Sequence, residues 1–246
     1  MAINSLLDTE FPIIQAPMAG VQDSALVIAV SNAGGLGSLP CAMLTPETLY
    51  AELTAIKSQT EKPFNVNFFC HTPPEPNIEC ELKWLEILQP YFKEFDINSA
   101  DIKRGAGREP FSVKAADILE EFKPPVVSFH FGLPSNSLLS RVKDWGATIL
   151  ASATTIEEAK WLEKNGADAI IAQGIEAGGH RGMFLSNDLS TQIERFALVT
   201  RLIERVKLPV IAAGGISSAK DVADALSLGA SAVQIGTAYL LCPETK

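Results

Sequence analysis

Residues 148–173 read TILASATTIEEAKWLEKNGADAIIAQ, and no other stretch of the sequence indicates the fold class more clearly. It begins with one apolar run, Thr148–Ser152, and ends with a second, Ala169–Gln173. Between them, Thr155 and Glu158 have the spacing of a capping box, apolar residues recur at helical intervals, and a glycine then ends the helix. Apolar runs without alternation are typical of parallel strands that are buried on both faces. The stretch therefore predicts one strand–helix–strand unit.

The same pattern recurs along the chain. Near its end, Ser217 or Ser218 opens a helix over Ala219–Leu228, and Gly229 closes it. Eight strands alternating with helices predict an α/β fold, a closed (β/α)₈ TIM barrel, and 246 residues is an ordinary length for one. The expected strands are Pro12–Ala16, Gly35–Ser38, Phe64–Phe68, Val126–Phe129, Thr148–Ser152, Ala169–Gln173, Val210–Ala213 and Ala232–Ile235.

One segment interrupts the repeat between the third and fourth strands. It covers about residues 70–124 and includes two amphipathic pieces, near Glu81–Phe92 and Ser112–Phe122. We expect it to be an insertion that caps one end of the barrel, so that residues 1–246 form a single domain.

Composition excludes several classes of protein. The chain carries 29 acidic and 20 basic residues, a net charge of −9, which argues against nucleic acid as a partner. No apolar window is long enough for a transmembrane helix, and Met1–Pro12 lacks the basic start of a signal peptide, so we expect no membrane association and a cytoplasmic location. The four cysteines form no C-x-x-C pair and the three histidines are scattered, which predicts reduced thiols and no metal site.

Polar and glycine-rich segments follow six of the strands. In such a barrel the carboxyl ends of the strands share one rim, where active sites lie. The segments are IQAPMAG at residues 14–20, NVNFF at 65–69, SFHFG at 128–132, AQGIEAGGHRG at 172–182, PVIAAGGI at 209–216 and QIGTA at 234–238.

The last two segments indicate a phosphate site. Glycines after the seventh and eighth strands leave backbone N–H groups bare, the helix that begins near Ser217 directs its positive end the same way, and Thr237 adds a hydroxyl. Other nucleotide and hydrolase signatures, G-x-G-x-x-G, G-x-x-x-x-G-K-[ST] and G-x-S-x-G, are missing from the sequence.

Taken in order, the segments at 14–20, 128–132, 172–182 and 209–216 resemble the nitronate monooxygenases, FMN-dependent barrels formerly called 2-nitropropane dioxygenases. The Gly-Gly-His-Arg-Gly part is also similar to flavin-dependent enoyl-ACP reductases, whereas the His130 segment favours the nitronate monooxygenase branch. The resemblance implies oxidation of alkyl nitronates, or of nitroalkanes, with O₂ to a carbonyl compound and nitrite.

The resemblance also implies the residues that would bind FMN. The backbone of Ala16, Pro17 and Met18 would lie against the isoalloxazine. Asn67 and Gln173 would hydrogen-bond the ring or the ribityl chain. The phosphate would be approached closely by Gly178, Gly179, Gly214, Gly215, Gly236 and Thr237.

His180 is the expected catalytic residue. Histidine titrates near neutral pH, so His180 would remove the proton next to a nitro group or, when protonated, stabilise a nitronate anion. His130 is expected to orient or bind the substrate, and Met18 to pack on the flavin and the substrate. We expect no role for His71 and a surface position for Arg181 and Lys220. Glu176 either orients its neighbours or is a solvated carboxylate.

Members of the family usually continue beyond the eighth strand with a helical segment that covers the barrel. Its lack here would leave an apolar patch that favours a homo-oligomer.

Two alternatives to the monooxygenase stay open. One is an NAD(P)H-dependent flavin reductase of the enoyl-ACP reductase or quinone reductase type, and the other is a flavin-binding barrel without turnover because of C-terminal truncation. A phosphate-dependent lyase or isomerase is disfavoured, since no strand ends in a Schiff-base lysine.

Overall fold

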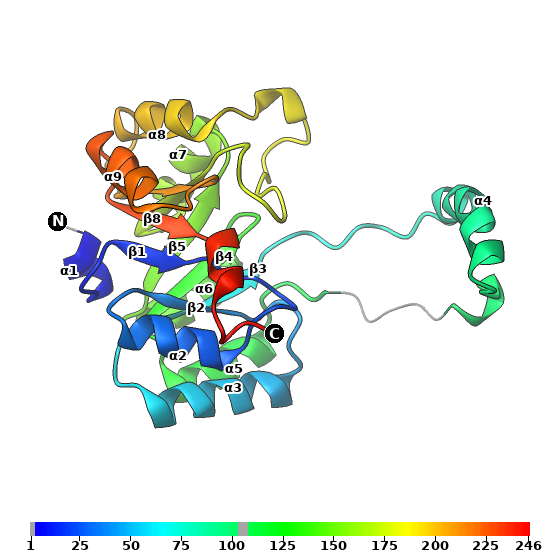
Figure 1. Ribbon diagram of the computed structural model, residues 1–246, viewed down its shortest axis with the longest axis horizontal. Helices are drawn as coiled ribbons and strands as arrows, with labels where there is room; N and C mark the ends of the chain where they lie inside the picture. Colours follow the sequence, from blue (N-terminus) through cyan, green and yellow to red (C-terminus); the bar gives the residue numbers. More distant parts are fainter. Residues whose placement is uncertain (1–2, 103–107) are drawn as a thin grey trace. The chain divides into compact units, whose positions relative to one another are not determined.

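The computed structural model describes residues 3–102 and 108–246, without the side chains of Asn4 and Ser5. Among these residues, eight parallel strands form one sheet in the order β1-β8-β7-β6-β5-β4-β3-β2 (Figure 1). The strands are β1 (Ile13–Gln15), β2 (Gly37–Pro40), β3 (Phe64–Phe69), β4 (Val126–His130), β5 (Thr148–Ala153), β6 (Ala169–Gln173), β7 (Val210–Ala213) and β8 (Ala232–Ile235). A bridge between Ile14 and Leu36 joins β1 to the start of β2. The TIM-barrel prediction is therefore confirmed.

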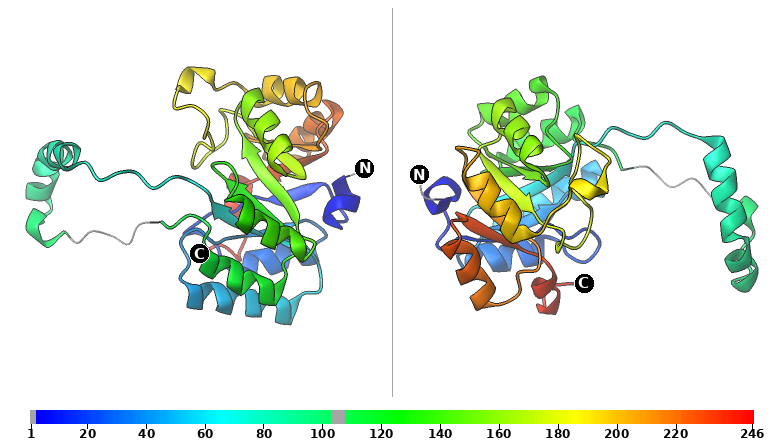
Figure 2. Two further views of the ribbon diagram at one scale, coloured as in Figure 1. Left: turned by 180° about the vertical axis from the view of Figure 1, so that it is seen from behind. Right: turned by 90° about the horizontal axis from the view of Figure 1, so that it is seen from above.

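Helices cover the outside of this sheet (Figure 1; Figure 2). They are α2 (Ser24–Asn32), α3 (Pro46–Gln59), α5 (Val113–Phe122), α6 (Asn136–Asp144), α7 (Ile156–Asn165), α8 (Arg195–Ile203) and α9 (Ala219–Ser227). The short helix α1 (Ile3–Leu7) buries Ile3 and Leu7 in the cluster of side chains that fills the barrel interior. The 3₁₀ helix η3 (Thr237–Leu241) follows β8.

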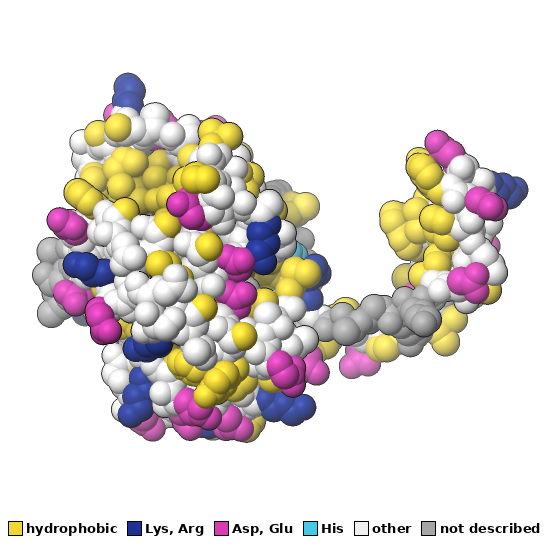
Figure 3. Space-filling view, turned by 60° about the horizontal axis from the view of Figure 1, so that its bottom comes forward, with side chains coloured by type: hydrophobic (Ala, Val, Ile, Leu, Met, Phe, Trp, Pro, Cys, Tyr) yellow, Lys and Arg dark blue, Asp and Glu magenta, His cyan; other side chains and the backbone are white. Residues whose placement is uncertain are grey.

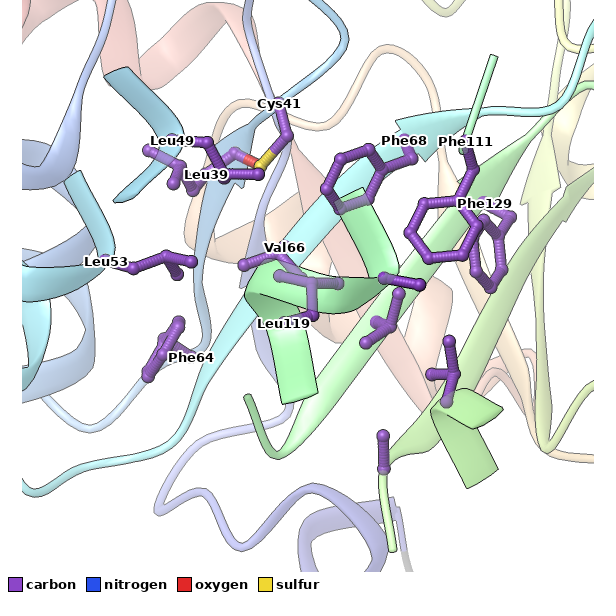
Figure 4. Close-up of a cluster of buried hydrophobic side chains, with 14 of the residues drawn as sticks. Leu39, Cys41, Leu49, Leu53, Phe64, Val66, Phe68, Phe111, Leu119 and Phe129 are labelled. Carbon is purple, nitrogen blue, oxygen red and sulfur yellow. The ribbon is translucent and has the colours of Figure 1, made fainter. Parts of the chain in front are cut away.

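The outer wall packs as the sequence pattern requires. Helices α2, α3, α5 and α6 lie against β2, β3 and β4 around one apolar cluster, which is drawn in Figure 4. At its centre the rings of Phe111 and Phe129 lie 5.3 Å apart, close to Phe68. Burial of large aromatic side chains provides much of the free energy that holds such a wall together.

Helix α5 belongs to this wall, because it buries Ala116 and Leu119 and contacts α3 and α6. The chain consists of two compact units. One unit combines Met1–His71 with Pro110–Lys246, and the other is Thr72–Glu109. The segment outside the barrel is thus shorter than the expected insertion of residues 70–124, and residues 103–107 within it lie outside the described residues. An amphipathic pattern is common to a barrel helix and an inserted helix, so the sequence did not distinguish α5 from the insertion.

The unit Thr72–Glu109 contains α4 (Ile78–Glu94) and the 3₁₀ helix η1 (Ser99–Asp101). Asn77 caps α4 by accepting a hydrogen bond from the N–H of Cys80, at 3.0 Å. Trp84 and Ile87 are 59% and 60% exposed, and no residue of α4 is buried. Hydrophobic side chains gather along one side of this helix (Figure 3).

A groove of about 260 Å³ lies outside the barrel wall. It is lined mainly by β1, α2 and the segment after β8, with Phe11, Ile13 and Tyr239 among its apolar walls. It contains none of the polar residues at the carboxyl ends of the strands. Among the described residues, no helix is both long and apolar enough to cross a membrane.

Candidate functional site

The barrel interior changes character along its axis. Near α1 it is apolar, with Ile14, Leu150 and Ile211 in one buried cluster. Toward the carboxyl ends of the strands, the buried side chains become polar and are hydrogen-bonded to one another, to His130 or to loop backbone. They are Gln15, Ser38, Asn65, Asn67, Ser128, Ser152 and Gln173. Buried polar groups are costly unless they are paired, so this layer is built for recognition more than for stability.

One side of the polar layer is organised by Gln15 and Gln22. Nε2 of Gln15 donates to Oε1 of Gln22 at 2.7 Å, and Oε1 of Gln15 accepts from the N–H of Ser38 at 2.9 Å. The N–H of Met18 also donates to Oε1 of Gln22, at 2.9 Å. This network fixes the backbone after β1, including Ala16, whose N–H donates to the carbonyl of Ile235 at 2.7 Å.

Asn65 and Asn67 continue the layer on β3. Both side-chain amides donate to Oγ of Ser128 on β4, each at 2.9 Å. The second acceptors differ: Nδ2 of Asn65 also donates to Oγ of Ser38 at 3.0 Å, and Nδ2 of Asn67 to the carbonyl of Ser128 at 3.3 Å. Oδ1 of Asn65 is buried and has no partner among the described residues. Asn67 is held in place through its Nδ2, which leaves its oxygen for another donor.

His130, at the end of β4, is committed to the protein on both ring nitrogens. Nε2 lies 3.2 Å from the carbonyl oxygen of His180 and Nδ1 lies 3.0 Å from Oγ of Ser152. A carbonyl only accepts, so Nε2 carries the proton and Nδ1 accepts from the serine hydroxyl. Burial, together with the nearby charges of His180 and Arg181, lowers the pKa of His130 to about 4. His130 is thus a neutral orienting residue at neutral pH.

The loop after β6 carries His180 and is fixed by Gln173. Nε2 of Gln173 donates to the carbonyl of His180 at 2.9 Å, and its Oε1 accepts from the N–H of Gly182 at 2.7 Å. Arg181 folds back to donate to the carbonyl of Gly174 at 2.7 Å. The side-chain amide expected to bind flavin, that of Gln173, is therefore used to hold the loop, and Arg181 is a structural residue and not only a surface charge.

Glu158 anchors the continuation of this loop. Its carboxylate is 1% exposed and accepts from the N–H groups of Thr154 and Phe184, both at 2.7 Å. The sequence assigned Glu158 to a capping box, but only half of that motif forms: Thr155 caps the N–H of Glu158 at 3.2 Å. The carboxylate serves the loop instead, a long-range role that spacing along the chain does not reveal.

The ring of His180 is exposed and stands among aromatic side chains. Its centroid is 5.3 Å from that of Phe69 and 6.0 Å from that of Phe131. His71, for which no role was expected, lies 6.2 Å from both phenyl rings, and its Nδ1 is buried without a partner. The three histidines therefore meet around two phenylalanines. Among the described residues, no group of three or more acidic, histidine or cysteine side chains is arranged to hold a metal, and the four cysteines are free.

The glycines after β7 and β8 lie where a phosphate was expected. Gly214 and Gly215 have φ of +119° and +60°, conformations that a residue with a side chain rarely adopts. Gly236 precedes η3, whose first residue is Thr237, so this short helix follows β8 as in many phosphate-binding barrels. The start of α9 differs from the expectation, because the carboxylate of Asp221 accepts from the N–H groups of Ser217 and Ser218 and already pairs that helix end.

The glycines of the rim differ in the space around them. A Cβ built on Gly178 or Gly179 would meet nothing within 4 Å, and one on Gly236 would lie 3.5 Å from Ala16 and 3.7 Å from Sδ of Met18. Oε1 of Gln234, on β8, is buried without a partner. The open glycine backbone and the unpartnered oxygen of Gln234 are compatible with a ligand that has polar edges, such as a flavin ring.

The structure thus gathers the expected residues at one rim, although it uses some of them differently. Ala16 and Met18 lie near Gly236, while His130 and Gln173 hold the backbone of the His180 loop. Ser152 and Glu158 were missed. A serine in a strand carries no motif of its own, and the capping-box motif of Glu158 points to a local role and not to the loop.

The sequence of the chain is similar to the sequences of named proteins. A family model described as nitronate monooxygenase matches residues 2–246. A nitronate monooxygenase of Paraburkholderia phytofirmans is 45% identical over 248 residues, which cover 99% of this chain and 67% of that protein. One of Pseudomonas aeruginosa is 46% identical over 244 residues, covering 98% and 69%.

Two solved structures are also similar. Nitroalkane oxidase from Streptomyces ansochromogenes superposes with a TM-score of 0.87 at 37% identity, over 100% of this chain and 70% of the other. FabK from Thermotoga maritima gives a TM-score of 0.74 at 29% identity, over 100% and 64%.

Proposed function

The chain belongs to the nitronate monooxygenase family, a family of oxidoreductases, and we propose that it binds FMN at the carboxyl-terminal rim of the barrel and oxidises alkyl nitronates, or nitroalkanes, with O₂. The products are a carbonyl compound and nitrite. The observation that carries the proposal is the exposed ring of His180, which stands over the rim on a loop fixed by Gln173 and His130.

FMN, when bound, would supply the transfer of electrons from substrate to O₂. We propose that the backbone at Ala16–Met18 and the side chain of Asn67 face its ring system. Gly214, Gly215, Gly236 and Thr237 would then surround its phosphate. The open backbone at Gly178 and Gly179 supports this placement, because a bulky side chain there would occupy the same space.

His180 would be the residue that exchanges a proton with the substrate or stabilises its charge. Its ring lies beside Phe69 and Phe131, on the loop that follows β6. A neutral imidazole would remove the proton α to a nitro group, and an imidazolium would stabilise the negative charge of a nitronate. His130 would act on the reaction through the loop backbone, as a positioning residue, since both of its nitrogens are occupied.

The Gly-Gly-His-Arg-Gly segment, which is similar to flavin-dependent enoyl-ACP reductases, supports a second candidate, an NAD(P)H-dependent flavin reductase. Two measurements on the purified, FMN-reconstituted protein separate the candidates. The monooxygenase predicts a flavin absorbance spectrum, O₂ uptake and nitrite release with a nitronate and without NADH. Oxidation of NADH in the absence of a nitro compound, with no nitrite from nitronate, would support the reductase. A colourless protein that does not take up FMN would remove both candidates.

A further inference from the structure

Arg195 is a buried cation with little to compensate its charge. It is the first residue of α8 and is 6% exposed. Among the described residues, its guanidinium makes one hydrogen bond, from Nη1 to the carbonyl of Gly214. Nε is buried and has no partner, and no ion pair of Arg195 occurs within the described residues. A guanidinium has five N–H donors, so most of its capacity is unused, and an unpaired buried charge is strongly unfavourable.

The neighbours of Arg195 leave its positive charge in place. The carboxylate of Glu176 lies nearby, but it accepts from the backbone N–H of Arg195, at 2.9 and 3.0 Å, and not from the guanidinium. On another side, Cζ of Arg195 lies 4.5 Å from the ring centroid of Phe196. A ring face and a carbonyl attract a cation without neutralising it.

The guanidinium also lies beside the glycine turn that follows β7. A Cβ built on Gly215 would be 3.7 Å from Nη1 of Arg195. Gly214 and Gly215, both at positive φ, turn the backbone of β7 at this point. A buried cation and a bare glycine turn therefore adjoin each other, and their common ligand would be an anion.

We infer that Arg195 is the counter-charge for a phosphate group bound at the Gly214–Gly215 turn, and that this residue makes the site select a phosphorylated flavin over an unphosphorylated one. Arginine suits this task, because its planar donors match phosphate oxygens in pairs. The inference rests on the proposed binding of FMN, whose ribityl phosphate would be the ligand, but it does not depend on turnover.

A purely structural role is the alternative, in which Arg195 only supports the β7 turn through the carbonyl of Gly214. The two roles differ in one measurable respect. A structural residue affects binding of every flavin, whereas a counter-charge affects only the flavin that carries a phosphate.

The test compares FMN with riboflavin. The full chain, freed of flavin, is titrated with each compound by quenching of flavin fluorescence, for the unchanged protein, for Arg195→Gln and for Arg201→Gln. Arg201 lies on the exposed side of the same helix and controls for loss of one positive charge. We expect Arg195→Gln to weaken FMN binding by about tenfold to a hundredfold and riboflavin binding by less than about threefold. Arg201→Gln should leave both unchanged, and equal losses for FMN and riboflavin in Arg195→Gln would overturn the inference.

A second measurement uses the unchanged protein, in case Arg195→Gln does not fold. Inorganic phosphate should raise the Tm of the flavin-free chain and compete with FMN but not with riboflavin. Equal affinity for FMN and riboflavin, with no effect of phosphate, overturns the inference while leaving flavin binding intact. If neither flavin binds but phosphate still raises Tm, the anion site is supported and the proposed function fails.

Discussion

Nε2 of His130 donates a hydrogen bond to the carbonyl oxygen of His180, across 3.2 Å and between the ends of β4 and the β6 loop. Gln173 donates to the same oxygen at 2.9 Å. The carbonyl of His180 therefore accepts two hydrogen bonds. The exposed ring of His180 extends from a backbone that these bonds hold in place. We propose that one ring of the pair serves positioning and the other chemistry, and the predictions below separate these two roles.

The first prediction concerns pH and His130. Its pKa is lowered from 6.5 to about 4, so between these values the folded protein binds fewer protons than the unfolded chain. The contribution of neutral His130 to the stability of the folded protein is therefore complete above pH 6.5 and is lost as the pH falls toward 4. We expect a loss of roughly 2 kcal/mol from this half-buried group. Urea unfolding of the unchanged protein and of His130→Gln at pH 7 and 4.5 measures it; parallel curves for the two proteins would contradict the assignment.

The second prediction concerns the proton step at His180. In His180→Asn, oxidation of neutral nitroalkanes should fall by about a hundredfold or more, since general-base catalysis commonly contributes that much. Oxidation of preformed nitronates should fall less, because they carry no proton to remove. Nitrite release from matched pairs of nitroalkane and nitronate gives the two ratios. Equal losses would exclude the role of base and leave only stabilisation of the anion.

The third prediction contrasts two glycines in the His180 loop. A Cβ on Gly182 would lie 2.6 Å from Cε1 of His130, whereas one on Gly178 would meet nothing within 4 Å. Gly182→Ala should therefore destabilise the flavin-free protein by roughly 1–3 kcal/mol, through displacement of His130. Gly178→Ala should leave its Tm unchanged and weaken only FMN binding. Similar behaviour of the two variants in thermal unfolding and FMN titration would disagree with the described loop.

The fourth prediction tests the buried carboxylate of Glu158. In Glu158→Gln, an amide NH₂ group would face N–H donors of Thr154 or Phe184, where a carboxylate oxygen accepts now. We expect a loss of roughly 2–3 kcal/mol in the free energy of unfolding and faster amide hydrogen exchange at Phe184 and Leu185. Glu157→Gln, at the exposed neighbouring position, is the matched control and should change neither quantity. Slow exchange retained in Glu158→Gln would show that the loop is held by other contacts.

Much of the fold could be predicted because parallel strands bury both faces. The runs Ala169–Gln173, Val210–Ala213 and Ala232–Ile235 were expected with the bounds that the structure has. The second strand was placed two residues early. Leu36 pairs with Ile14 of β1 by an isolated bridge, and the regular ladder with β3 begins only at Gly37. Apolar pattern alone does not tell on which side a short strand finds its first partner.

The site could be predicted only in part. Strand ends locate the rim, because all parallel strands end on the same side, and this brought His130, Gln173 and His180 together correctly. The direction of each side chain depends on tertiary contacts. Whether Gln173 points at a ligand or back at the loop depends on where Gly182 and the carbonyl of His180 lie, and no spacing rule contains that information.

The His180 loop has its supports on four different elements. Ser152 on β5 supports His130 on β4, Gln173 closes β6, and Glu158 on α7 receives the N–H of Phe184. If the loop sequence alone were grafted onto another barrel, we expect that it would not keep this conformation. Exchange of the loop between related enzymes should succeed only as a package with these partners, which sets the smallest unit in which recombination, natural or engineered, can alter this active site.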